Sequence, residues 1–597
     1  MKYICNPVNI NYRYQFIKDT VSGQTSLSRE SADPSMIYFQ GKYYIFASVT
    51  LGVWESEDLV KWNYYRLPEN LPLYDYAPDV CVAGEYVYFC ASSNEKICNY
   101  YRTKDIVHGP YEELPGTFDF WDPHLYRDDD GRFYFYWGCA WDTPIWGVEL
   151  DAETMRPIGE KKPLLSGDAF TKGYERIGED HSEFPLSDAQ IQEAYRLYLH
   201  EKETAEDTAQ DKQILAFKGK LGNRPYIEGP WMTKHQGIYY LQYACPGTEY
   251  NVYANGVYVS KSPLGPFKLA ENNPYSYHPG GFFPGAGHGS TMTDRYGNLW
   301  HTATMRISVN HVFERRIGIW PAGFDPDGQL FCNQRYGDWP FAIEERNVDP
   351  WKEPEWFLLS YKKTVRSSSC RKGHEAACAV DENVRTWWRA ASGDSGEWLE
   401  LDLENLYDVY AIQVNFADDK LDLPAPGEMK GKTMPRIIEE REMYTRWILE
   451  GSEDGKRYFV IEDKAEAKTD LPHDLIVREH GIRVRYLRLT ILETPYHQNP
   501  CISGYRVFGI GNGTKPETPK FTAQRIGDLD MEIQISETNA IGYNILWGHK
   551  PEKLYHSYLT FGTKQKIGAL VKDTNYYVRV DAFNENGISK GCYLVRL

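Results

Sequence analysis

The sequence lacks any apolar run near the roughly 18 residues that a membrane-spanning helix needs, which excludes an integral membrane protein. No Cys-X-X-Cys pair occurs, and the eleven cysteines are scattered and odd in number, which predicts mostly free thiols. The N-terminus, MKYICNPVNINYRYQF, has no apolar core and no small-residue cleavage site. We therefore expect a cytoplasmic protein, with a secreted or periplasmic one as the alternative if a leader has been removed.

Basic residues are also too few for a phosphate-binding surface. Lysine and arginine number 66 against 84 aspartates and glutamates, giving a net charge of −18 and excluding a nucleic-acid partner. Aromatic residues are abundant instead, at 15% of the chain with 46 tyrosines. Such an excess favours β-structure and flat apolar faces for neutral ligands.

An internal repeat is the most informative pattern. Five segments share a turn glycine followed by a β-rich aromatic run, and these glycines lie 43, 47, 106 and 60 residues apart. The segments are GKYYIFAS from Gly41, GEYVYFCAS from Gly84, GRFYFYWG from Gly131, GIYYLQYA from Gly237 and GNLWHTAT from Gly297. Each reads as the second strand of a hairpin, and a second hairpin follows most of them. Five consecutive four-stranded sheets predict an all-β, five-bladed β-propeller over residues 1–345.

The rest of the chain predicts two further β-structures. Residues 346–512 read as a linker followed by an antiparallel β-sandwich, and residues 513–597 as a small immunoglobulin-like sandwich. The long third interval of the repeat carries a charged, partly helical insertion around 165–215, which we expect to form a wall or lid of a site.

An ionisable residue precedes each repeat glycine by five to nine positions: Asp33, Asp79, Asp122, Glu228 and His288. Each one alone is also an ordinary turn signal. Five in nearly one register favour a site, because the innermost strands of a propeller start around one axis. Carboxylates held close together raise the pKa of at least one of them, which provides the general acid and base of glycosidic hydrolysis.

At these motifs the sequence resembles glycoside hydrolase family 43. The resemblance covers roughly residues 25–340, through ADPSMIYFQGKYYIFAS, YAPDV, FWDPHLYRDDDGRFYFYWG, IEGPWMTKHQGIYYLQYA and GAGHGS. It implies an inverting enzyme in which Asp33 is the general base, Glu228 the general acid, and Asp122 raises the pKa of Glu228. It also implies that His288 lies beside a Ca²⁺ ion or water cluster at the axis, so a structural Ca²⁺ is a hypothesis, while the chemistry requires no cofactor.

Further residues are candidates for holding a sugar. Tyr76 and Asp79 are candidates for hydroxyl binding, Trp121 for stacking on a sugar face, and Arg315 and Arg316 for a hydroxyl clamp. The insertion adds three residues that could reach the pocket or lie in a solvated loop: Glu175, Glu179 and His181.

The two C-terminal regions also resemble known modules. DENVRTWWRA and SGYRVFG resemble discoidin, or coagulation factor 5/8 C-type, galactose-binding-like domains, and residues 515–597 resemble fibronectin type III. In such a domain Trp387 and Trp388 are expected to lie in the core. Neither module is expected to take part in the chemistry.

The leading hypothesis is an exo-acting α-L-arabinofuranosidase that acts on oligosaccharides or polysaccharides of plant type. A β-xylosidase and an exo-β-galactosidase are the alternatives within the family. A glycoside phosphorylase, which would need a basic phosphate pocket, and a non-catalytic carbohydrate-binding propeller are the alternatives of other classes. The sequence leaves the oligomeric state open.

Overall fold

The computed structural model describes residues 2–19, 23–92, 96–202, 225–343, 346, 348–431, 434–592 and 594–597. It confirms the predicted all-β fold, whose α-helix in these ranges is α1 (Asp188–Lys202). No helix in the described part of the chain is long and apolar enough to cross a membrane. No disulfide joins any of the eleven cysteines, all of which lie in the described ranges.

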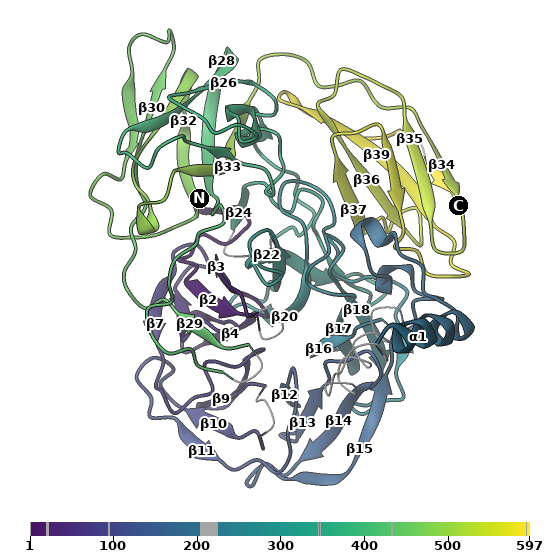
Figure 1. The fold of residues 1–597 in the computed structure, drawn as a ribbon. Coiled ribbons are helices and arrows are strands. Elements are labelled where there is room, and N and C mark those ends of the chain that lie inside the picture. Colours follow the sequence, from purple (N-terminus) through teal and green to yellow (C-terminus); the bar gives the residue numbers. More distant parts are fainter. Residues whose placement is uncertain are drawn as a thin grey trace.

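Five four-stranded antiparallel sheets form the blades of the propeller (Figure 1). Blade I contains β4 (Ser35–Phe39), β5 (Lys42–Phe46), β6 (Gly52–Ser56) and β7 (Asn63–Arg66). Blade II contains β8 (Asp79–Ala83), β9 (Tyr86–Cys90), β10 (Tyr100–Thr103) and β11 (Glu112–Leu114). Blade III contains β12 (His124–Arg127), β13 (Phe133–Trp137), β14 (Ile145–Leu150) and β15 (Pro157–Leu165). Blade IV contains β16 (Glu228–His235), β17 (Ile238–Cys245), β18 (Ala254–Ser260) and β19 (Lys268–Leu269). Blade V contains β20 (Gly287–Thr293), β21 (Leu299–Arg306), β22 (Arg315–Phe324) and β23 (Leu330–Cys332).

The first strands of the blades close a ring. β4 contacts β8, β8 contacts β12, β12 contacts β16, β16 contacts β20, and β20 returns to β4. Apolar clusters fill the spaces between neighbouring blades, as where Met36 and Trp54 of blade I pack with Trp300 and Ile319 of blade V. The starts of the five inner strands therefore meet around one axis, as the repeat predicted.

The N-terminal strands β1 to β3 pair with other strands outside the five blades. β1 (Lys2–Ile4) pairs with β24 (Phe341–Ile343), just after blade V. β2 (Tyr14–Lys18) and β3 (Thr25–Arg29) form a hairpin before blade I, and β29 (Arg436–Ile438), from far along the chain, adds to the free edge of β2. This three-stranded sheet joins the N-terminal hairpin to the region that follows the propeller.

Two β-structures lie beside the ring (Figure 1). The first is an eight-stranded sheet system. Its strands are β25 (Phe357–Leu358), β26 (Thr364–Ser367), β27 (Trp388–Arg389), β28 (Glu397–Phe416), β30 (Arg446–Ser452), β31 (Phe459–Asp463), β32 (His473–Glu493) and β33 (Cys501–Ile510). Trp387 and Trp388 are buried there, as expected.

The second β-structure, at the C-terminus, consists of two smaller sheets. One contains β34 (Phe521–Arg525), β35 (Met531–Ile535) and β38 (Lys564–Ile567). The other contains β36 (Gly542–Gly548), β37 (His556–Thr560), β39 (Tyr577–Asn584), β40 (Gly587–Ser589) and β41 (Val595–Arg596). The discoidin and fibronectin likenesses of these two regions, and the exact domain limits, remain predictions.

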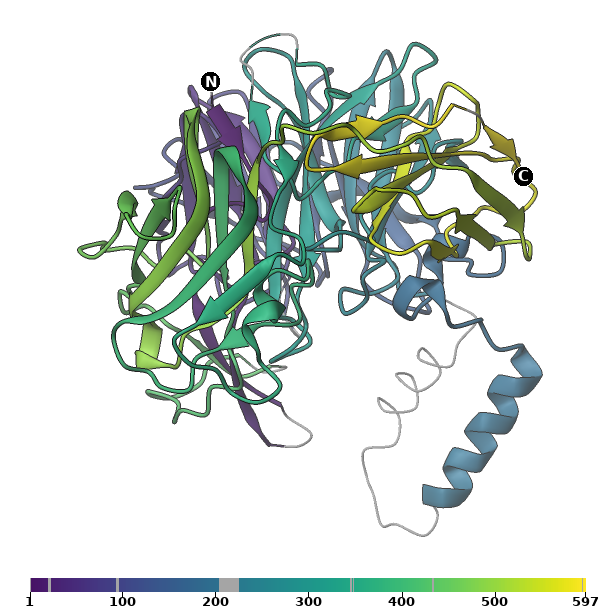
Figure 2. The same cartoon turned by 90° about the horizontal axis from the view of Figure 1, so that it is seen from above.

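The insertion packs against the C-terminal structure rather than closing the propeller. The Arg176 guanidinium is paired with the Asp530 carboxylate at 2.8 Å, and the Gly173 amide donates to the Leu570 carbonyl at 2.8 Å. α1 extends away from the body of the molecule (Figure 2). The last part of the predicted 165–215 insertion, from residue 203, lies outside the described residues.

Candidate active site

One residue per blade has a left-handed backbone at the start of the inner strand. These residues are Asp33, Ala77, Asp122, Gly229 and His288, with φ values of 51°, 51°, 48°, 54° and 44°. A non-glycine residue held in this conformation costs on the order of 1–3 kcal/mol, and such strain concentrates at functional sites. The five-fold recurrence shows that the loops are one structural element repeated around the axis.

This element corrects the expected register in blade II. Its position there is occupied by Ala77, whereas Asp79 is two residues further on, at the first position of β8. Oδ1 of Asp79 lies 2.9 Å from Nδ1 of His124, and its Oδ2 accepts the Leu125 amide at 2.7 Å. Both oxygens of Asp79 thus join blade II to blade III, which differs from the expected contact with a sugar hydroxyl.

His288 lies between the carboxylates of two other blades. Its Nδ1 is 3.4 Å from Oδ1 of Asp33 and 3.6 Å from Oδ2 of Asp122. Burial alone would lower the pKa of His288, but the charges of Asp33, Asp122 and Glu228 raise it. A Cβ at Gly229 would lie 2.7 Å from the imidazole ring, so glycine is needed where blade IV approaches it.

Asp33 lies in a positively charged environment. Ser48 Oγ donates to its Oδ2 at 2.6 Å, and Arg315 Nη1 lies 3.3 Å from its Oδ1. Burial would raise the pKa of Asp33, but Arg315, His288 and the Ser48 hydrogen bond together lower it below its ordinary value. Asp33 is therefore a carboxylate that stays ionised although it is only 5% exposed.

Arg315 belongs to a buried chain of charges that reaches the region after the propeller. Its Nη2 contacts Oε1 of Glu30 at 2.5 Å, and Nη1 of Arg436 lies 3.2 Å from Oε2 of the same carboxylate. Arg436 also donates a hydrogen bond to the Tyr76 hydroxyl, and its guanidinium lies 4.7 Å from the centre of that ring. Arg436, which the sequence analysis did not identify, therefore contacts Tyr76 directly and is linked to Arg315 through Glu30.

Glu228 lies in a different environment. The Tyr253 hydroxyl donates to its Oε1, and Cys139 Sγ lies 3.6 Å from its Oε2. Burial and then the charge of Asp122 raise the pKa of Glu228 to about 7. Ligand atoms of Asp122, Cys139 and Glu228 all lie within 4.8 Å of one another. A carboxyl group in this environment still carries its proton near neutral pH.

The pKa of Asp122 is also raised, by burial first and by the charge of Asp33, although His288 opposes the shift. Two buried carboxyl groups this close cannot both ionise freely, so they share their charge. Because the pKa of Glu228 reaches about 7, Glu228 is the partner that we expect to keep the proton near neutral pH.

Comparison with known families agrees with this geometry. The model of "Glycosyl hydrolases family 43" matches residues 26–179 and 177–330, which together span half of the chain and all five blades. The chain belongs to glycosyl hydrolase family 43. It is therefore an enzyme that hydrolyses glycosidic bonds, and its substrate is an oligosaccharide or polysaccharide.

Curated relatives match part of the chain at low identity. The family 43 chain is 27% identical over 277 residues to "Xylosidase/arabinosidase 43A" of Humicola insolens, covering 40% of this chain and 78% of the relative. It is 25% identical over 272 residues to "Xylosidase/arabinosidase" of Bacteroides ovatus, covering 40% and 75%. Among solved structures, "Bacteroides ovatus Xyloglucan PUL GH43B" is 15% identical with a TM-score of 0.41, over 85% of this chain and 99% of that chain.

The second arginine of the expected clamp does not face the carboxylates of this family 43 enzyme. Arg316 is 1% exposed; its Nε donates to His473 Nε2 at 2.9 Å and its Nη1 to the Arg29 carbonyl at 2.9 Å. Its neighbour Arg315 points to Asp33, because successive residues of a strand face opposite sides. Arg316 therefore joins the propeller to β32, which corrects the sequence expectation. Trp121 is half-buried beside Asp122, and its stacking on a sugar remains a prediction.

The insertion residues are structural in this arrangement. Glu175 is fully buried and pairs with Lys172 Nζ at 2.7 Å. His181 is also fully buried, its Nδ1 lies 2.8 Å from the Arg176 carbonyl, and burial lowers its pKa to about 3. Glu179 pairs with Arg306 at 2.8 Å. Arg306 of β21 thus ties the insertion to blade V, and the Tyr243 hydroxyl of β17 in blade IV donates a hydrogen bond to Glu175.

The residues around His288 do not form an evident calcium site. In the described part of the chain, the one group of His, Cys, Asp or Glu side chains close enough to share an ion is Asp122, Cys139 and Glu228, and it does not include His288. Ca²⁺ prefers six to eight oxygen ligands, whereas Nδ1 of His288 faces the two carboxylates. A structural Ca²⁺ beside His288 remains a prediction.

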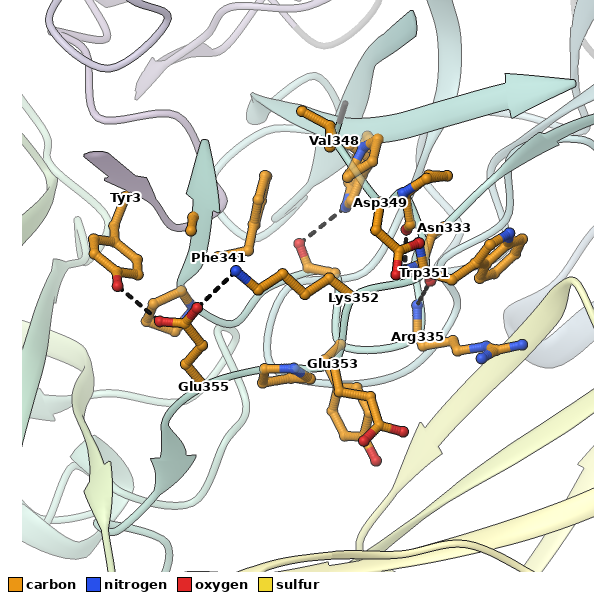
Figure 3. Close-up of a pocket in the computed structure, with 18 of the residues that line it drawn as sticks. Tyr3, Asn333, Arg335, Phe341, Val348, Asp349, Trp351, Lys352, Glu353 and Glu355 are labelled. Atoms are coloured by element: carbon orange, nitrogen blue, oxygen red, sulfur yellow. Dashed lines mark hydrogen bonds and ion pairs between the residues drawn. The ribbon is translucent and has the colours of Figure 1, made fainter. Parts of the chain in front are cut away.

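A separate small cavity of about 60 Å³ lies where β24, the linker and the C-terminal structure meet (Figure 3). Glu355 accepts a hydrogen bond from the Tyr3 hydroxyl at 2.7 Å and pairs with Lys352 at 2.7 Å. Arg335 covers the Trp351 ring at 4.5 Å. These contacts are internal to the junction, and the residues that line the cavity include none of Asp33, Asp122, Glu228 and His288.

Proposed function

We propose that this family 43 enzyme is an inverting, exo-acting glycosidase in which Asp33 is the general base and Glu228 the general acid. The observation that carries the proposal is the difference between the two environments. Arg315 and His288 lie against Asp33 and lower its pKa, whereas Glu228 contacts Tyr253 and Cys139, and burial and the charge of Asp122 raise its pKa to about 7. Opposite shifts of two buried carboxyl groups at one site supply an ionised base and a protonated acid at the same pH.

The reaction follows from these protonation states. Asp33 takes a proton from a water molecule, whose oxygen attacks the anomeric carbon. Glu228 gives its proton to the leaving glycosidic oxygen as the bond to the anomeric carbon breaks. The net proton is passed from water to the leaving alcohol, and attack on the face opposite the leaving group inverts the configuration. His288 and Arg315 hold Asp33 from two sides while Asp122 keeps Glu228 protonated.

The terminal sugar that we propose is α-L-arabinofuranose, with β-xylose as the second candidate. The support is that the relatives from Humicola insolens and Bacteroides ovatus are both named as xylosidase/arabinosidase. The phosphorylase alternative is disfavoured, because Arg315 is committed to Glu30 and Asp33, and Arg436 to Glu30 and Tyr76, leaving neither one for a phosphate.

The test is hydrolysis of 4-nitrophenyl α-L-arabinofuranoside, β-D-xyloside and β-D-galactoside side by side. We expect the highest kcat/KM on the arabinofuranoside, and proton NMR should show the inverted anomer of the sugar as the first product. A retained anomer would overturn the mechanism, whereas a preference for the xyloside or galactoside would change only the sugar. Dependence of turnover on inorganic phosphate would favour the phosphorylase.

A further inference from the structure

A cysteine side chain lies between the proposed acid and its charged neighbour. Cys139 follows β13, and its Sγ is 3.6 Å from Oε2 of Glu228 and 2.7 Å from the Tyr226 hydroxyl. With Asp122 and Glu228 it forms a group whose ligand atoms lie within 4.8 Å of one another. The mechanism above assigns no task to this thiol, although it touches the group that must give up a proton.

The thiol and the phenol beside it are neutral. Burial raises the pKa of Cys139 and of Tyr226 well above their ordinary values, and the nearby carboxylates add to the shift. A phenol is a stronger donor than a thiol, and a carboxylate is the strongest acceptor present. The hydrogen bonds therefore run from the Tyr226 hydroxyl to Sγ, and from the thiol to a carboxylate.

A thiol is a weak donor and a weak acceptor. When Glu228 is ionised, Cys139 stabilises the negative charge less than a hydroxyl would. When Glu228 is protonated, sulfur does not compete with the leaving oxygen for the proton as a hydroxyl oxygen would. The thiol also takes up space in which a water molecule would otherwise solvate the charged form.

We propose that Cys139 is a positioning residue that keeps Glu228 in its proton-donating form by placing a weak hydrogen-bonding group, instead of a hydroxyl or water, against its carboxyl. The proposal deepens the proposed function and rests on the role of Glu228 as general acid. The other titratable groups that face Glu228 stay unchanged in the test: Asp33, Asp122, Tyr226, Cys245, Tyr253 and His288.

The experiment compares Cys139→Ser with Cys139→Val by the pH dependence of kcat/KM on an aryl glycoside with a poor leaving group. The serine variant should shift the alkaline limb of the kcat/KM profile to lower pH by about half a unit or more, because a stronger hydrogen bond favours the ionised form of Glu228. The valine side chain has no hydrogen-bond donor and excludes water, so this variant should keep the alkaline limb at the wild-type pH or shift it to higher pH. If valine destabilises the fold, Cys139→Ala should place the limb between those two.

A substrate with an activated leaving group, such as a 2,4-dinitrophenyl glycoside, needs little protonation. On it, both variants should stay within about twofold of wild type. Equal losses on both substrates, an unmoved limb in the serine variant, or a valine shift as far down as that of serine would overturn the proposal. The matched control is Cys378→Ser and Cys378→Val, at a half-buried thiol outside the propeller, which should not change the profile.

Failure of this proposal can be told from failure of the proposed function. Glu228→Gln should lose activity on the poor leaving group and keep much of it on the activated one. If Glu228→Gln behaves so while the Cys139 variants leave the limb in place, Glu228 keeps its role and only Cys139 loses the one proposed here. If Glu228→Gln retains full activity on both substrates, the proposed function is itself wrong.

Discussion

The two halves of the catalytic cluster differ in the charge of their surroundings. Asp33 lies against Arg315, with a hydroxyl from Ser48. Glu228 lies among neutral groups, Tyr253 and Cys139, with the negative charge of Asp122 close by. Burial raises the pKa of both carboxyls, so burial cannot separate their roles. The charge of the neighbouring side chain separates their roles, since it is positive beside Asp33 and negative beside Glu228. His288 lies between the two halves.

The base half also depends on the chain beyond the propeller. Arg436, on β29, contacts Glu30 and Tyr76, and through Glu30 it is linked to Arg315. For the acid half, the described contacts of Glu228 all come from within the propeller. The two halves should therefore respond differently to changes in the region after residue 345.

Removing either carboxyl should have the largest effect. Asp33→Asn and Glu228→Gln should each lower kcat by at least roughly 10²-fold on a poor leaving group. On a 2,4-dinitrophenyl glycoside, Glu228→Gln should recover and Asp33→Asn should not, because only the acid becomes dispensable. Steady-state kinetics on both substrates measures this, and circular dichroism and melting temperature should show that the variants are folded. Recovery of the Asp33 variant would reverse the two assignments.

Cutting the link to the later region should have a smaller effect, confined to the base half. Arg436→Met should lower kcat/KM about tenfold and lower the melting temperature, because Glu30 is fully buried and loses one of its two cationic partners. The loss should be the same on poor and activated leaving groups. A loss limited to the poor leaving group would mean that Arg436 acts on the acid. Arg441→Met, at an exposed arginine paired with Glu439, is the matched control.

Removing the negative charge of Asp122 beside the proposed acid should shift the pH profile of kcat/KM more than it lowers the maximal rate. Asp122 raises the pKa of Glu228, so Asp122→Asn should lower that pKa and move the alkaline limb of kcat/KM down by about one pH unit. Activity should fall most at neutral and alkaline pH, and less on activated substrates. If Asp122 only caps its turn, the variant will lose stability and keep the shape of its profile.

The repeat in the sequence predicted most of the architecture. Turn glycines and aromatic strands gave the five blades, and the ionisable residues before the glycines located Asp33, Asp122, Glu228 and His288 at one axis. The sequence did not reveal which residue takes the left-handed conformation in each blade, because that residue is Ala77 in blade II and Gly229 in blade IV, and neither is ionisable. In blade II, the distance in sequence to Gly84 could not show that Asp79 is the first residue of β8 and that the strained loop position is Ala77, two residues earlier.

Groups that reach the cluster from outside these loops were missed. Ser48, Ser92 and Cys139 all lie seven or eight residues after a repeat glycine, where the second strand ends, and each contacts an acidic residue of the cluster. That spacing was visible in the sequence and could have found them. Arg436 had no such signal, because its contact with Tyr76 depends on β29 pairing with β2 across most of the chain.

The smallest expected effect on activity is at Asp79, which the sequence placed in the site and the structure places between blades. Asp79→Asn keeps an acceptor for the Leu125 amide and weakens the contact with His124, so unfolding should become about 1–3 kcal/mol easier. Turnover and the pH profile should not change, because no contact of Asp79 reaches Asp33 or Glu228. Urea unfolding together with kcat/KM across pH measures both. If kcat/KM falls tenfold at unchanged stability, Asp79 belongs to the sugar site after all, and its contacts with His124 and Leu125 do not define its role.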